Sequence, residues 1–80
     1  MKIRKTTILN KQEDLYIYEN KKDDYFVVAV PVLEWSTYFT YDDSKDELVS
    51  RWSESLNEKV GGEEQAIELA LKIFGWTREM

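Results

Sequence analysis

The chain has 80 residues, of which 42% are apolar, 14% aromatic and 34% charged, and it contains neither Cys nor His. This length suits one small domain, and the share of apolar and aromatic residues is typical of a folded chain. The absence of Cys and His from the sequence excludes disulfides, ordinary zinc sites, thiolate nucleophiles and histidine bases. We therefore expect a single domain over residues 1–80 that is not an enzyme and has no cofactor or metal.

The net charge of −5 is unevenly distributed along the chain. Residues 1–12 hold four bases and no acid, whereas residues 13–80 hold seven bases and sixteen acids. Because phosphate binding depends mainly on Lys and Arg, this acidic body disfavours nucleic acid as the main partner. The opening MKIRKTT lacks an apolar run of signal-peptide length, and no stretch approaches the ~20 apolar residues of a membrane span. We expect a cytoplasmic protein with no membrane contact, and the many Lys, Asn, Glu and Ile residues are typical of a bacterial or phage source.

The first half of the chain has the pattern of β-structure. We expect a first strand at Lys2–Leu9 and a second at Leu15–Glu19, in which apolar side chains alternate with tyrosines. The stretches NKQED and NKKDD that follow the two strands are polar and rich in turn-forming residues. Loops of about five residues fit antiparallel hairpins, so the sequence predicts a meander.

Residues 25–41 are apolar on both faces of any strand they form, and they contain Pro31. Proline has no N–H for a sheet ladder, and one strand of this length would exceed the usual 3 to 10 residues. We therefore predict a strand at 25–30, a break near Pro31–Glu34 and a strand at about 35–41. The alternative is one long strand that is bent by a bulge at Pro31.

The second half of the chain has the pattern of two helices. Ser44 followed by Glu47 is a capping box, which predicts a helix over Lys45–Lys59 that Gly61 and Gly62 end. The residues expected to face inward are Leu48, Val49, Trp52, Leu56 and Val60.

The second helix is expected at Glu63–Phe74, with Gly75 ending it and Trp76 packing back on the last turn. Its expected inward residues are Ala66, Ile67, Ala70, Leu71 and Phe74. The sequence thus predicts an α+β fold, in which an antiparallel meander of three or four strands is followed by two helices packed on one face.

A calcium site is the main alternative use of the stretch DDSKDE. Asp42, Ser44 and Asp46 have the spacing of the first ligands of an EF-hand loop, but Glu47 replaces the required Gly and Ser53 the final Glu. The capping box already accounts for these residues, so we predict no metal here.

The candidate partner-binding residues fall into two groups. Two short helices cover one face of a small sheet, so we expect the other face to expose an aromatic surface that includes Tyr16, Tyr18, Trp35 and Tyr38. Tyrosines that simply shield a solvated face are the alternative. The second group is an acidic surface around the first helix, which includes Asp42, Asp43, Asp46, Glu54 and Glu58.

These two groups favour a small non-enzymatic protein that binds another protein or a second copy of itself. Its acidic surface would suit an inhibitor or regulator of a basic partner. One alternative is an antitoxin or repressor-like homodimer that contacts DNA through the basic N-terminal strand. A second alternative is a small enzyme that uses carboxylates alone.

Overall fold

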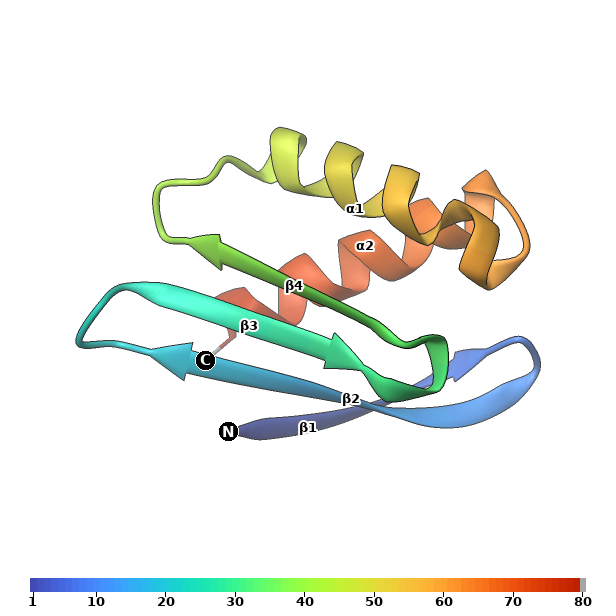
Figure 1. The fold of residues 1–80 in the computed structure, drawn as a ribbon, viewed down its shortest axis with the longest axis horizontal. Coiled ribbons are helices and arrows are strands. Elements are labelled where there is room, and N and C mark those ends of the chain that lie inside the picture. Colours follow the sequence, from blue (N-terminus) through green and yellow to red (C-terminus); the bar gives the residue numbers. More distant parts are fainter. Residues whose placement is uncertain (80) are drawn as a thin grey trace. The chain divides into compact units, whose positions relative to one another are not determined.

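The computed structural model describes residues 1–79, and the chain divides at Asp42 into two compact units. The first unit is a sheet of four strands: β1 (Lys2–Ile8), β2 (Lys11–Asn20), β3 (Tyr25–Val30) and β4 (Trp35–Thr40). The second unit contains two helices, α1 (Lys45–Val60) and α2 (Glu63–Arg78) (Figure 1). This order confirms the predicted α+β class and its ββββαα arrangement.

The sheet is a meander with the strand order β1-β2-β3-β4, and every neighbouring pair is antiparallel. Leu9 and Asn10 alone connect β1 to β2, and both have positive φ angles, of 51° and 69°. Two consecutive residues with positive φ form the tight turn that is favoured in hairpins, because its backbone twist matches the twist of the two flanking strands. The residues from Lys11 onward are therefore part of β2, and the prediction that a polar loop separates β1 from a strand starting at Leu15 is wrong.

Pro31 begins a short 3-10 turn, η1 (Pro31–Leu33), between β3 and β4. Glu34 ends this turn with a φ of 52°, and its N–H donates to the carbonyl oxygen of Pro31. Residues 25–40 therefore form two strands, as predicted, and the alternative of one bent strand is wrong. Pro31 occupies the first position of this turn. A backbone N–H at that position would have no partner within the helix, so proline is accommodated there without loss of a hydrogen bond.

One face of the sheet is buried. The neighbours Ile17 and Val28 are fully buried there, and the rings of Phe26 and Phe39 stack with their centroids 5.0 Å apart. Trp35 also lies on this face and is only 6% exposed, so its predicted place on the exposed aromatic surface is wrong. The buried apolar residues of the strands are Ile8, Leu15, Ile17, Phe26, Val28, Val30, Trp35 and Phe39.

Helix α1 begins and ends where the sequence predicts. The hydroxyl oxygen of Ser44 accepts a hydrogen bond from the N–H of Glu47 at 3.3 Å, which satisfies one of the free donors of the first turn. At the other end, Gly61 adopts a φ of 87° and donates its N–H to Asn57. The buried residues of α1 are Leu48, Trp52, Leu56 and Val60.

Helix α2 does not end at Gly75 but continues to Arg78, and Trp76 is helical. Its buried residues are Ala66, Leu69, Ala70, Ile73 and Thr77, whereas Ile67 and Leu71 are 37% and 44% exposed. The predicted end and the predicted inward positions of Ile67 and Leu71 are thus wrong. A glycine inside a helix lowers its stability by only about 1 kcal/mol relative to alanine. The burial of Ile73 and Thr77, on either side of Gly75, outweighs this loss.

Candidate protein-binding face

The face of the sheet opposite to the buried one is built from rows of residues that pair directly across the strands. One row contains Tyr18, Val27 and Tyr38. The row on one side of it contains Tyr16, and the row on the other side contains Tyr25. Because side chains alternate between faces along each strand, these rows share one side of the sheet. We call this surface the aromatic face and define it as Ile3, Tyr16, Tyr18, Tyr25, Val27, Ala29 and Tyr38.

Three tyrosine rings form a continuous line across β2, β3 and β4. The centroid of Tyr25 lies 6.2 Å from that of Tyr18 and 5.1 Å from that of Tyr38, with tilted rings in both pairs. These pairs are diagonal neighbours on adjacent strands, within the range where aromatic rings attract each other. The side-chain amide of Asn20 also donates to the hydroxyl of Tyr25 at 3.3 Å. The central ring is therefore held from three sides.

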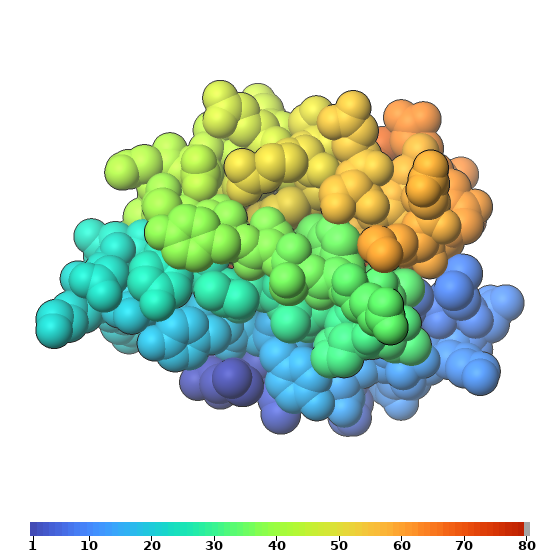
Figure 2. Space-filling view, in the orientation of Figure 1, coloured from blue at the N-terminus to red at the C-terminus, as the bar shows by residue number. Residues whose placement is uncertain are grey.

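Much of the aromatic face is open to solvent. Tyr38 is 59% exposed, Ile3 is 57% exposed and Tyr18 is 38% exposed, while Tyr16 and Val27 are half-buried. The side chains of β2, β3 and β4 follow one another without interruption in the space-filling view, from light blue through cyan to green (Figure 2). Contiguous exposed apolar surface of this kind usually marks a contact with another protein.

The aromatic face has little charge, although 34% of the chain is charged. Beside its residues Ile3 and Tyr16, Lys5 and Asp14 pair across β1 and β2 with an Nζ to Oδ1 distance of 2.7 Å. The hydrogen bond from Lys5 to Asp14 raises the pKa of the lysine above its usual value. This pair is exposed and balances its own charge, so the surface beside it is electrically neutral.

The structure brings three of the four predicted aromatic residues together, namely Tyr16, Tyr18 and Tyr38, and it excludes Trp35. It adds Ile3 and Tyr25, which sequence reasoning did not assign to this surface. Alternation along β3 could have identified Tyr25, because it lies two residues from Val27. Ile3 also requires the strand register, because its pairing with Tyr16 shows which side of the sheet it faces.

The predicted acidic residues lie at the end of the sheet unit and along α1. Asp42 follows the sheet and donates its N–H to the hydroxyl of Thr40 at 3.3 Å. Asp46 lies in the first turn of α1, where its charge favours the helix end, whereas Glu54 and Glu58 lie one turn apart farther along α1. These three are exposed, and Asp43 is half-buried just before the helix.

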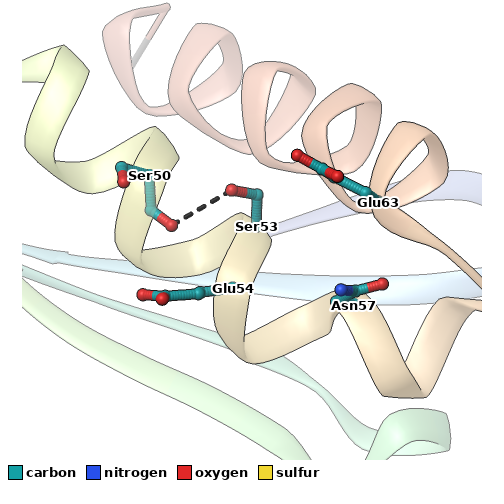
Figure 3. A pocket seen from close by; sticks show the side chains of 5 residues that line it. All are labelled: Ser50, Ser53, Glu54, Asn57 and Glu63. Atoms are coloured by element: carbon teal, nitrogen blue, oxygen red, sulfur yellow. Dashed lines mark hydrogen bonds between the residues drawn. The ribbon is translucent and has the colours of Figure 1, made fainter.

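A pocket of about 250 Å³ lies between α1 and the start of α2. It is lined by Ser50, Ser53, Glu54, Asn57 and Glu63 (Figure 3). The hydroxyl of Ser53 donates to the carbonyl oxygen of Ser50 at 3.0 Å, and two of the lining residues, Glu54 and Glu63, are carboxylates. The pocket is polar and open, and we assign no chemistry to it.

Tyr41 lies near the other face of the sheet and donates its hydroxyl to the carboxylate of Glu19. This hydrogen bond, together with burial and the charges of Glu19 and Asp24, raises the pKa of Tyr41 to about 12. The ring of Tyr41 also lies 5.3 Å from that of Phe26. The contact therefore supports the edge of the packed rings and is no part of the aromatic face.

The fold and this surface define a small α+β protein with an exposed aromatic sheet face. A family model of YueH-like proteins matches residues 2–79, so the chain belongs to the YueH-like family. It is 45% identical over 84 residues to Uncharacterized protein YueH of Bacillus subtilis (strain 168), and the match covers 100% of both chains. No solved structure matches the chain significantly. Neither helix of the described residues has the length and apolar character that crossing a membrane requires.

Proposed function

We propose that the protein is a small non-enzymatic interaction or regulatory protein that binds another protein through the aromatic face. The observation that carries this proposal is the line of Tyr18, Tyr25 and Tyr38, of which Tyr38 is 59% exposed. Tyrosines of this kind are enriched at protein interfaces because they combine a large apolar area with a hydroxyl and lose little conformational entropy.

The acidic residues of α1 provide a second property that would favour binding to another protein, namely negative charge. Asp46, Glu54 and Glu58 are exposed, and the whole chain has a net charge of −5. This charge would steer the protein toward a basic partner, as in an inhibitor of a nucleic-acid-binding protein. Binding that rests on this attraction should weaken as salt is added, whereas binding that rests on the aromatic face should not.

The alternative of a DNA-binding homodimer draws on the bases of β1. Lys5 is paired with Asp14, and Arg4 is half-buried, so two of the three bases of this strand are less available to phosphate than the sequence suggests. We therefore rank DNA binding below protein binding. A salt-dependent mobility shift with duplex DNA would reverse this order.

The test of the proposed function is site-specific photocrosslinking in host cells. A photoreactive phenylalanine analogue replaces Tyr38 in one strain and Ile67, which is exposed on α2, in a control strain. We expect a crosslinked protein product from position 38 that is absent or much weaker from position 67. Equal products from both positions, or none from position 38, would overturn the proposal.

A further inference from the structure

The strand β1 forms one edge of the sheet, since among the described residues it pairs with β2 alone (Figure 1). Four of its seven residues are exposed, against two of six in β4 at the other edge. It contains no proline, and its pairing with β2 runs without a bulge from Lys2 to Ile8. A straight edge of this kind presents backbone groups to which another strand can be added.

The turn between β1 and β2 determines which backbone groups face this edge. A two-residue turn is closed by hydrogen bonds between the residues that flank it, here Ile8 and Lys11. Along an antiparallel ladder, hydrogen-bonded pairs then alternate with pairs that are not bonded. The N–H and C=O groups of Ile3, Lys5 and Thr7 therefore point away from β2, toward the position of an added strand.

The same three residues determine where the side chains of an added strand would lie. A strand bonded to Ile3, Lys5 and Thr7 pairs directly with them, and their side chains lie on the side of the aromatic face. Every second side chain of the added strand would therefore extend a row of the aromatic face by one position. Strand addition at β1 is thus continuous with the proposed contact surface.

The side chains of β1 indicate the chemistry of the added strand. Ile3 is 57% exposed beside Tyr16, so a large apolar side chain opposite it would remove apolar area from water. Asp14 accepts from one of the three N–H donors of the Lys5 ammonium, and 63% of the Lys5 side chain is exposed, so an acid opposite it is favoured. Lys2 is also exposed and favours a second acid.

A second copy of the chain does not offer such a strand. Its edge strands are β1, which contains the bases Lys2, Arg4 and Lys5 and no acid, and β4, whose sequence WSTYFT has no charge. Pairing β1 with another β1 would bring like charges together on neighbouring strands. Building on the proposed function, we propose that a different protein adds an extended segment to β1, in which an acidic residue lies two positions from a large apolar residue.

The first test uses the synthetic peptide Thr-Thr-Val-Glu-Val-Ile-Glu-Thr with blocked ends. Bound antiparallel to β1, it places its Ile opposite Ile3 and its two Glu residues opposite Lys5 and Lys2. NMR of the labelled whole chain should show slower hydrogen exchange at the N–H groups of Ile3, Lys5 and Thr7, because these donors enter the new ladder. The control peptide has Lys in place of both Glu residues and should bind roughly tenfold more weakly.

Two methylated peptides separate strand addition from contact through side chains alone. The first carries an N-methyl group on the Glu opposite Lys5, whose N–H would donate to the carbonyl oxygen of Lys5. The second carries it on the Val that follows this Glu, whose N–H would point away from β1. The side chains are identical, so we expect the first peptide to bind roughly tenfold more weakly and the second to bind like the unmodified one.

The photoreactive residue at position 38 tests the same contact in host cells. Thr7→Pro removes an outward N–H without removing a bond to β2, and proline is tolerated in an edge strand at such a position. We expect Thr7→Pro to reduce the crosslinked product roughly tenfold, whereas Thr7→Ala keeps the N–H and should not. Circular dichroism checks that both variants fold. Equal products from the two folded variants would overturn the added strand.

The peptides can contradict the proposal in separate ways. Absence of binding, binding without protection of Ile3, Lys5 and Thr7, or equal binding of the two methylated peptides would overturn strand addition. Equal binding of the Lys peptide would overturn the acidic segment. An unprotected edge with a crosslink from position 38 would retain the proposed function and reject the added strand. A protected edge without that crosslink would instead reject the aromatic face as the binding surface.

Discussion

The ring of Tyr25 lies 5.1 Å from that of Tyr38 on the neighbouring strand, and Tyr25 is the only ring in contact with both other tyrosines of the line across β2, β3 and β4. It is half-buried, while Tyr38 is 59% exposed. The two residues therefore have different tasks: Tyr25 fixes the positions of its neighbours, and Tyr38 offers area for contact. Rings that are already positioned lose less freedom when a partner binds.

Replacing Tyr25 should test this division. We expect Tyr25→Ala to lower the free energy of unfolding by about 1–2 kcal/mol, because it removes two ring contacts and the bond from Asn20. Tyr38→Ala should cost less than about 1 kcal/mol and act mainly on binding. Urea unfolding followed by tryptophan fluorescence measures both, and an equal loss in the two variants would contradict the assignment.

The cap of α1 provides a second prediction. Ser44→Ala removes the oxygen that accepts from the N–H of Glu47, so we expect a loss of about 1 kcal/mol in the free energy of unfolding. Ser50→Ala, on the exposed surface of the same helix, is the control and should change stability by no more than about 0.5 kcal/mol. Thermal unfolding of both variants makes the comparison. If the two variants unfold alike, the cap contributes nothing.

Two glycines should respond to alanine in opposite ways. Gly75 is inside α2 and an added Cβ meets no atom within 4 Å, so Gly75→Ala should stabilise the protein by about 0.5–1 kcal/mol. Gly62 has a φ of 151°, and its added Cβ would lie 3.0 Å from the side-chain oxygen of Gln65, so Gly62→Ala should destabilise it. Urea midpoints of the two variants decide, and a destabilising Gly75→Ala would argue that α2 ends early.

The hydrogen bond between Tyr41 and Glu19 should appear in the pH dependence of stability. The pKa of Tyr41 is raised in the folded chain, to about 12 from 10.0, so the protonated tyrosine is the form that folding favours. Its contribution is complete below pH 10 and is lost as the pH rises toward 12. The difference in unfolding free energy between wild type and Tyr41→Phe should therefore shrink over this range, and a constant difference would contradict the contact.

Sequence patterns predicted the elements well where a local rule was strong. Ser44 with Glu47 located the start of α1, and Pro31 located the break between β3 and β4. Both residues act through the main chain of their own segment: one supplies an acceptor to a free N–H, and the other lacks a donor. Such effects do not depend on the rest of the fold.

The errors came mainly from interactions that lie outside one segment. The end of α2 depends on the burial of Ile73 and Thr77, which outweighs the weak preference of Gly75 for a helix end. One error was local: Trp35 and Tyr38 were placed on one face of β4, although residues three apart point to opposite faces of a strand, which the rest of the fold does not affect. Tyr25 was left out of the partner-binding residues because only the pairing of β2, β3 and β4 places it between the other two tyrosine rings.

The meander has a consequence for the speed of folding. Each strand pairs only with its neighbour along the chain, and the connections are as short as the two residues Leu9 and Asn10. The mean sequence separation of contacts within the sheet is therefore low for β-structure, and little loop-closure entropy opposes its formation. The sheet should assemble hairpin by hairpin, faster than sheets of similar size whose strands are paired across distant parts of the chain.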